Sequence, residues 1–251
     1  MGVEVNLGGY LSDKSGQKAA IKRIIDAAID EGIYVLVDWH SHYAENSKQD
    51  AINFFKEIAT EYGDYPNIIY EIYNEPLDDT PWNSVIKPYA EDVITEIRKI
   101  DPDNLIIVGT RTWSQRVDEA ANNPITMDDN VAYTIHFYAG THKNSIRNHV
   151  RTAVNKGVAV FATEWGMSRA NGGTDSLGNN DNFIGKSETN TWLNFLDDND
   201  ISWINWSVFD KDEASAALDG TMGQEMTDTI HWDQLSPSGT WVKDRLRSYW
   251  D

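Results

Sequence analysis

Residues 68 to 76 read Ile-Ile-Tyr-Glu-Ile-Tyr-Asn-Glu-Pro, so that a run of apolar and aromatic side chains ends in an amide, a carboxylate and a proline. Near-continuous apolar runs are typical of parallel strands that are covered on both faces of a sheet. The first six of these residues therefore predict a buried strand. Comparable runs predict further strands, for six in all, at 33–39, 105–109, 131–137, 158–163 and 201–208.

Helical patterns lie between the predicted strands. Apolar residues recur every three or four positions at 17–30, 51–62 and 84–100, and further helices are predicted at 145–155, 187–198 and 239–249. Alternation of strand and helix predicts an α/β fold with a parallel sheet. A (β/α)8 TIM barrel is one solution and a doubly wound sheet is the other. The first predicted helix does not begin with Gly-x-Gly-x-x-Gly, and this argues against a doubly wound sheet that binds nucleotides.

The predicted strands are too few to close an eight-stranded barrel. Residues 1–10 supply at most one more strand, which would be short and glycine-rich. We therefore expect an incomplete barrel, with residues 1–251 forming a single domain.

Composition narrows the class of partner. The 251 residues include no cysteine, and 40 Asp and Glu against 21 Lys and Arg give a formal charge of −19. Such an acidic surface repels phosphate backbones and anionic lipids, so neither nucleic acid nor a membrane is expected as a partner. No apolar run approaches the roughly 18 residues of a membrane helix. The ten tryptophans suit flat ligands.

Polar residues gather where the strands end, at Asp38-Trp39-His40, Asn74-Glu75-Pro76, Gly109-Thr110, His136-Phe137-Tyr138, Glu164-Trp165-Gly166 and Asn205-Trp206-Ser207. The carboxyl ends of barrel strands form the rim where barrel enzymes perform chemistry. Two carboxyl groups at one rim are the minimum for cleaving an acetal, because one protonates the leaving oxygen and the other attacks or stabilises the anomeric carbon. Glu75 and Glu164 are the candidates.

Other strand-end residues suit supporting roles. His40, His136 and Tyr138 are suitable hydrogen-bond donors, and the Asn74 amide suits a sugar 2-hydroxyl. The tryptophans at or beyond strand ends favour sugar platforms over core packing, and they are Trp113, Trp165 and Trp206.

A metal site is a weaker alternative. His40 and His42 alternate as two ligands from one strand would, but no third ligand completes a recognisable pattern. No cofactor is therefore expected, and a metal-dependent hydrolase remains open as a rival hypothesis.

Taken together, these motifs resemble glycoside hydrolase family 5, most closely its bacterial endo-β-1,4-glucanases, or cellulases. The resemblance covers nearly the whole chain, and it rests on the segments 38–40, 70–76, 109–115, 136–142, 164–166, 203–207 and 210–216. It implies a retaining mechanism on a (β/α)8 barrel, with Glu75 as acid/base and Glu164 as nucleophile. It also implies a β-glucan substrate, with a mannanase, xylanase or lichenase activity, or a catalytically weakened glucan-binding protein, as alternatives.

The resemblance also implies roles for the surrounding residues. His136 and Tyr138 match the pair that orients the carboxylates, and Asn74 matches the contact to the sugar 2-hydroxyl. The sugar-binding positions that the family implies are His40 and Trp206 at the sugar that is attacked, Trp113 on the leaving-group side, and Lys211 and Glu213 at the sugar beyond.

The chain departs from the family at its front. Met1-Gly2-Val3 resembles the tail of the family's second strand, so the first strand and most of the second, with an arginine that holds the nucleophile charged, are not seen. Arg111 and Arg169 are candidate substitutes. Because an incomplete barrel exposes apolar edges, we expect a homodimer or higher oligomer. No signal peptide is visible, although the family leads us to expect secretion.

Overall fold

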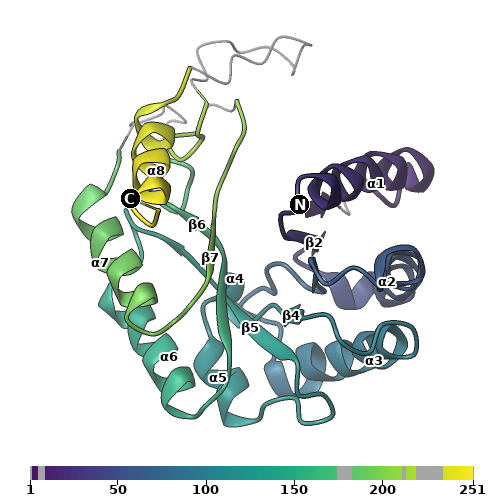
Figure 1. Ribbon diagram of the computed structural model, residues 1–251. Coiled ribbons are helices and arrows are strands. Elements are labelled where there is room, and N and C mark those ends of the chain that lie inside the picture. The colour runs from purple at the N-terminus through teal and green to yellow at the C-terminus, as the bar shows by residue number, and fades with distance from the viewer. Residues whose placement is uncertain (1, 5–8, 174–182, 211–212, 219–233, 251) are drawn as a thin grey trace. The chain divides into compact units, whose positions relative to one another are not determined.

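The computed structural model describes the chain except for residues 1, 5–8, 174–182, 211–212, 219–233 and 251 (Figure 1). The chain forms two compact units. The first comprises residues 1–135 and 149–161, and the second comprises residues 136–148 and 162–251. Each unit is described by itself.

Parallel strands form the centre of the first unit. They are β1 (Gly2–Glu4), β2 (Val35–His40), β3 (Ile68–Glu71), β4 (Ile106–Val108) and the first part of β5 (Val131–Tyr138). From β1 to β4, each strand pairs with the strand that follows it in the chain, as Val35 does with Ile68 and Ile106 with Val131. A doubly wound sheet reverses its strand order at a switch point. The order from β1 to β5 contains no reversal, which argues against that alternative.

The connections between these strands are helical. They contain α1 (Lys14–Asp30), η1 (Ala44–Ser47), α2 (Lys48–Tyr62), η2 (Trp82–Ile86), α3 (Lys87–Arg98), α4 (Arg111–Ser114) and α5 (Val117–Asn122). The end of α6 (Asn144–Asn155) follows β5 and also belongs to this unit. The predicted helix at 84–100 begins as the π-helical turn η2, in which the Ile86 N–H donates to the Pro81 carbonyl at 3.2 Å. The α-helical part follows with a proline in its first turn, where no helical partner for an N–H is needed.

Aromatic side chains fill the first unit's core. Trp39 at the end of β2 meets Phe54 and Phe55 of α2, and all three are fully buried. The Tyr10 ring packs edge-on against Trp39 with centroids 5.3 Å apart. This packing fixes the end of β2, and with it the position of the neighbouring His40.

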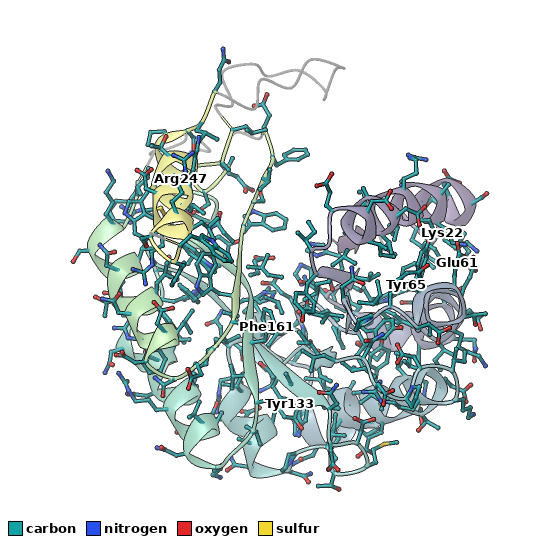
Figure 2. The ribbon with its side chains drawn as sticks, in the orientation of Figure 1. Lys22, Glu61, Tyr65, Tyr133, Phe161 and Arg247 are labelled. Atoms are coloured by element: carbon teal, nitrogen blue, oxygen red, sulfur yellow. The ribbon has the colours of Figure 1, made fainter. Side chains whose placement is uncertain are left out.

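Lysine–carboxylate pairs tie the outer helices together. Lys18 of α1 lies 2.6 Å from Glu57 of α2, and Lys56 of α2 lies 2.8 Å from Glu96 of α3. Figure 2 shows Lys22 beside Glu61, a further pair between α1 and α2. Exposed pairs of this kind each contribute little, commonly below about 1 kcal/mol, so the helices are held mainly by their buried faces.

The second unit continues the alternation. It holds the end of β5, the start of α6, most of β6 (Val160–Gly166), α7 (Lys186–Asp197), β7 (Trp203–Asn205) and α8 (Pro237–Arg247). Strands β6 and β7 are parallel, with a register shift between the pairs Ala162–Trp203 and Trp165–Asn205. Its core stacks Phe137 between aromatic rings, with the Trp192 centroid 4.0 Å away and the Trp165 centroid 5.8 Å away.

All six predicted strands are present, although most are shorter than predicted. With β1, the described residues contain seven strands. β1 pairs in parallel with β2, as expected for a barrel strand that directly precedes β2 in the chain. None of the described helices is both long and apolar enough to cross a membrane.

Candidate active site

Glu75 lies on the segment that leaves β3. The Asn74 N–H donates to the Trp39 carbonyl and the Glu75 N–H to the Ser41 carbonyl, each at 3.3 Å. These bonds extend the pairing with β2 beyond the strand itself. The Asn74 side chain is almost wholly buried, and Glu75 is partly exposed. The carboxyl group is therefore carried by a rigid backbone and still reaches solvent.

Close packing supports this segment from the side of β4. A Cβ atom added to Gly109 would lie 2.1 Å from the Tyr73 carbonyl oxygen, so only glycine allows the two chains to approach this closely. The Tyr73 hydroxyl donates to Oε2 of Glu45 at 2.5 Å, and the His42 carbonyl oxygen lies 3.0 Å from the same hydroxyl. Burial, and then the bond to Glu45, raise the pKa of Tyr73, which stays a neutral donor.

The two histidines at and just beyond the end of β2 have different partners. Nδ1 of His40 lies 2.8 Å from Oδ2 of Asp38, whereas Nδ1 of His42 lies 3.0 Å from the Glu75 carbonyl oxygen and 3.7 Å from Oε2 of Glu75. Taking each unit by itself, its described residues bring together no three His, Asp or Glu ligands for a metal ion. Nothing in this geometry favours the two-histidine metal site.

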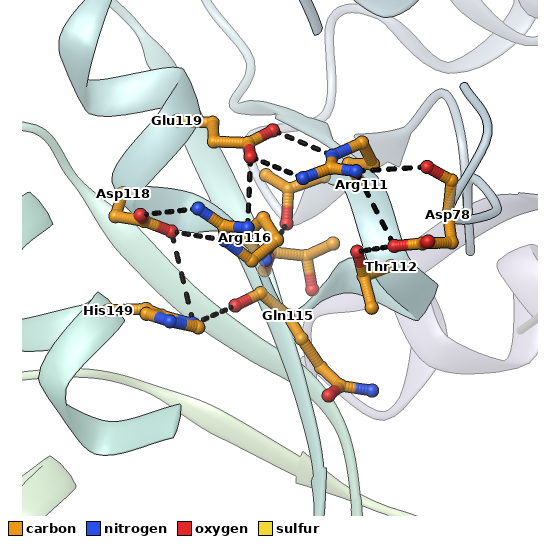
Figure 3. A network of polar contacts seen from close by, with 10 residues as sticks. Asp78, Arg111, Thr112, Gln115, Arg116, Asp118, Glu119 and His149 are labelled. Carbon is orange, nitrogen blue, oxygen red and sulfur yellow. Dashed lines mark hydrogen bonds and ion pairs between the residues drawn. The ribbon is translucent and has the colours of Figure 1, made fainter. Parts of the chain in front are cut away.

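Trp113 lies on the loop after β4, and 43% of its surface is exposed. The short helix α4 that carries it has positive φ angles at Thr112, Trp113 and Ser114. Figure 3 shows the polar network around this turn, which links Asp78, Arg111, Arg116, Glu119, Asp118 and His149.

Arg111, one candidate substitute for the family arginine, belongs to this network. Its Nε and a terminal nitrogen lie 2.9 and 2.6 Å from the two carboxylate oxygens of Glu119, and the hydrogen bond to Glu119 raises the pKa of Arg111. Beside this pair lies a cavity of about 480 Å³ that is also lined by Trp82 and Asn83. The guanidinium of Arg169, the other candidate, lies 4.6 Å from the centroid of the Phe183 ring. Substitution by either arginine stays a prediction.

Glu164 lies on β6 in the second unit, where its carboxylate accepts a hydrogen bond. The Tyr138 hydroxyl donates to Oε1 of Glu164 at 2.6 Å. A Cβ atom added to Gly166 would lie 2.7 Å from two atoms of the Tyr138 ring, so the glycine makes room for this tyrosine. A short bond from a neutral donor to a carboxylate fixes its rotamer and favours its charged form.

His136 and Thr163 form a second contact between β5 and β6. Nε2 of the buried His136 lies 3.0 Å from the Thr163 hydroxyl. The imidazole precedes Tyr138 by two residues on β5, and side chains two apart on a strand share a face. The sequence prediction that places His136 and Tyr138 together is consistent with this alternation.

Trp206 follows β7 and is partly exposed. Its indole N–H donates to Oε2 of Glu213 at 3.1 Å, and its backbone N–H donates to the Trp165 carbonyl at 2.8 Å. The peptide bond between Trp206 and Ser207 is cis. Two of the predicted sugar-binding residues are thus joined directly, whereas the predicted Lys211 lies outside the described residues.

The interpretation of Trp165 as a sugar platform is wrong. The side chain is fully buried, with its ring against Phe137 and edge-on to Trp203. Neighbouring residues on a strand face opposite sides of the sheet, so the face that presents Glu164 cannot also present Trp165.

Within the first unit, the structure places His40 at the end of β2, and Asn74, Glu75 and Trp113 on the segments that follow β3 and β4. Within the second unit it pairs Tyr138 with Glu164 and Trp206 with Glu213. Sequence reasoning gave no role of their own to Asp78, Thr112 and Ser114, which hold the Trp113 turn. Thr112 and Ser114 lie within the quoted segment 109–115, whereas the only signal for Asp78 was its position just after Asn74-Glu75-Pro76.

The sequence model described as Cellulase (glycosyl hydrolase family 5) matches residues 3–212. The chain belongs to glycoside hydrolase family 5. Among curated members, it is 52% identical over 216 residues to Endoglucanase Z of Dickeya dadantii, which covers 86% of this chain and 48% of that protein. It is 48% identical over 244 residues to an endoglucanase of Clostridium saccharobutylicum, covering 96% and 52% respectively. The chain thus spans about half the length of the curated relatives it matches.

Solved family 5 structures confirm the fold class. The catalytic domain of the Thermobifida fusca endoglucanase Cel5A matches with a TM-score of 0.86 at 32% identity, over 98% of this chain and 80% of that domain. A variant of the same domain, solved in complex with cellotetraose, matches with a TM-score of 0.85 at 31% identity over the same shares. The fold is therefore an incomplete (β/α)8 barrel of the family 5 type.

Proposed function

We propose that this family 5 protein is a retaining, endo-acting hydrolase of β-1,4-glucosidic bonds in cellulose or related β-glucans. The observation that carries the proposal is the 2.6 Å hydrogen bond from Tyr138 to Glu164, which prepares a carboxylate for attack, in a chain that also presents Glu75 on a rigid segment after Asn74. The endoglucanase names of the relatives and the cellotetraose bound to the Thermobifida protein support the substrate class.

The mechanism that we propose has two displacements. Glu164 attacks the anomeric carbon while the bond to the leaving sugar oxygen breaks, and Glu75 gives that oxygen its proton. Water then attacks the glycosyl-enzyme, Glu75 takes a proton from the water, and Glu164 leaves as a carboxylate. The product keeps the β configuration.

The surrounding residues take substrate-binding roles in this proposal. Asn74 contacts the 2-hydroxyl of the sugar under attack, and His40 and Trp206 also bind that sugar. Tyr138 and His136 orient the carboxyl groups, Lys211 and Glu213 hold the sugar beyond, and Trp113 stacks on the leaving-group side. We place the action outside the cell, because an insoluble polymer cannot enter it.

Two substitutions test the assignment on carboxymethyl-cellulose. Glu75→Gln and Glu164→Gln are each expected to lower turnover by several orders of magnitude, while Glu31→Gln, at an exposed position, leaves it unchanged. A dinitrophenyl β-cellobioside separates the roles, because its leaving group needs no proton. Glu75→Gln should then retain a burst of dinitrophenol that Glu164→Gln lacks. Full activity in either variant would overturn the assignment.

Further measurements address the alternatives. Proton NMR of the first product identifies the β anomer if the mechanism is retaining. Product profiles on mannan, xylan and lichenan distinguish the sister activities. Binding of cello-oligosaccharides without release of reducing sugar would instead indicate the catalytically weakened glucan-binding protein.

A further inference from the structure

The loop that carries Trp113 has an unusual backbone. Thr112, Trp113 and Ser114 have φ angles of 60°, 52° and 55°, so three consecutive residues with side chains are left-handed. This conformation costs roughly 1–2 kcal/mol for each residue that is not glycine, and most of all for a β-branched residue such as Thr112. The turn therefore persists only because surrounding contacts hold it.

Backbone contacts attach the turn to the segment that follows Glu75. The Trp113 N–H donates to the Pro76 carbonyl at 2.9 Å, and the Thr112 N–H to the Leu77 carbonyl at 3.4 Å. The buried Ser114 hydroxyl donates to the Asn74 carbonyl at 2.6 Å. The turn is thus built on the same stretch of chain that carries the proposed acid/base.

A side-chain contact completes the attachment. The Thr112 hydroxyl donates to Oδ1 of Asp78 at 2.8 Å, and a terminal nitrogen of Arg111 donates to the Asp78 carbonyl at 3.0 Å (Figure 3). The Asp78 side chain is 68% exposed, and its bond to Thr112 is therefore not required to satisfy a buried group. Its evident effect is to fix the strained residue that directly precedes Trp113.

We propose that Thr112 and Asp78 are positioning residues, whose hydrogen bond holds the left-handed turn that presents Trp113 to the sugar on the leaving-group side. This inference rests on the proposed function, since it assumes that Trp113 contacts substrate. It adds that the orientation of the indole depends on two polar residues outside the predicted site.

Two isosteric or conservative substitutions isolate the hydrogen bond. Thr112→Val keeps the size and the β-branching of the side chain and removes only the hydroxyl. Thr112→Ser keeps the hydroxyl and is the matched control. Trp113→Ala and the double variant Thr112→Val/Trp113→Ala show whether the threonine acts through the indole.

Two substrates separate positioning from a general structural effect. Cellopentaose places sugars on both sides of the bond that is cleaved, whereas β-cellobiosyl fluoride has only fluoride as its leaving group. We expect Thr112→Val to raise KM for cellopentaose about fivefold, as the loss of one hydrogen bond predicts, with kcat/KM on the fluoride unchanged. Thr112→Ser should behave as wild type, and the double variant should be no worse than Trp113→Ala.

Several results would overturn the proposal. The first is a wild-type KM for cellopentaose in Thr112→Val, and the second is an equal loss of activity on both substrates together with a lowered melting temperature. The third is a double variant in which the two single losses add. The fourth is a Trp113→Ala variant that cleaves cellopentaose as well as wild type does. A wild-type protein that cleaves neither substrate would instead count against the proposed function. In that case calorimetry with cellotetraose tests the positioning role by itself: Thr112→Val should weaken binding, and Thr112→Ser should bind as wild type does. Equal affinities of Thr112→Val and wild type would overturn the positioning role as well.

Discussion

The Tyr138 hydroxyl lies 2.6 Å from Oε1 of Glu164, and the two residues come from the successive strands β5 and β6. The bond orients the carboxylate and stabilises its negative charge. It depends on Gly166, which leaves space for the phenol ring. The proposed nucleophile is therefore positioned by its neighbouring strand and not by a loop.

Removing this donor should slow the first displacement. Tyr138→Phe is expected to lower kcat/KM on β-cellobiosyl fluoride about 10- to 100-fold, which corresponds to losing a hydrogen bond to a charged group. Tyr34→Phe is a suitable control because Tyr34 is 74% exposed. Steady-state fluoride release measures both variants. A change of less than twofold in Tyr138→Phe would show that the bond plays no part in catalysis.

Two tryptophans close in sequence to the site should respond in opposite ways. Trp165→Ala removes a fully buried ring and is expected to lower the free energy of unfolding by about 3–5 kcal/mol. Trp206→Ala removes a partly exposed ring, and its main effect should be a fall in kcat/KM of at least tenfold with little loss of stability. Urea unfolding and fluoride release on both variants test the contrast, which equal stabilities would contradict.

The buried Asp101 should make the first unit sensitive to acid. Burial alone would raise the pKa of Asp101, but hydrogen bonds from the Asn104 and Asp103 N–H groups and the Tyr70 hydroxyl outweigh it, so the pKa is lowered. A carboxyl group whose pKa is lowered by folding stabilises the protein above its unfolded pKa, near 3.9, and loses that contribution as the pH falls further.

Asp101→Asn should therefore reduce stability at pH 6 and flatten the loss between about pH 4 and pH 2.5, relative to wild type. Thermal unfolding followed at several pH values measures this slope. Asp103→Asn retains the backbone donor and is the matched control. An unchanged slope in Asp101→Asn would assign the acid sensitivity to other groups.

Apolar side chains at the start of the first unit bear on the oligomeric state. Ile24 is 43% exposed, Ile33 57% and Tyr34 74%. Exposed apolar side chains favour association where they form a contiguous patch, and Ile33 and Tyr34 are neighbours in the chain. We expect a homodimer or higher oligomer in light scattering after size exclusion, and Ile33→Asp should shift it toward monomer while Met127→Glu does not. A stable wild-type monomer at micromolar concentration would refute the expectation.

The positions of the strands could be predicted from the sequence, because parallel strands that are buried on both faces consist of continuous apolar runs. The segment 68–73 and the strand β3 agree at their start, although the regular pairing ends at Glu71. The helix predicted at 84–100 was less accurate. Apolar spacing does not distinguish an α-helix from the π-helical turn that opens it.

The residues at the strand ends were predicted, but some of their environments were not. Trp165 could have been placed in the core from sequence, because it alternates with Glu164 on one strand. The left-handed turn at 112–114 was beyond such reasoning. It contains no glycine, and it is imposed by contacts with residues 74–78 that lie more than thirty positions earlier in the chain.

The strand order of the first unit also bears on how the chain acquires its structure during synthesis. Val35 pairs with Ile68 and Ile106 pairs with Val131, so that each pairing closes a modest loop to the strand made just before it. Because each strand pairs with the strand made just before it, the sheet of this unit can grow in the order of synthesis, with its N-terminal part first. We expect the loops of Glu75 and Trp113 to be formed on the ribosome before Glu164 has been translated. Protease resistance of stalled nascent chains would reveal it.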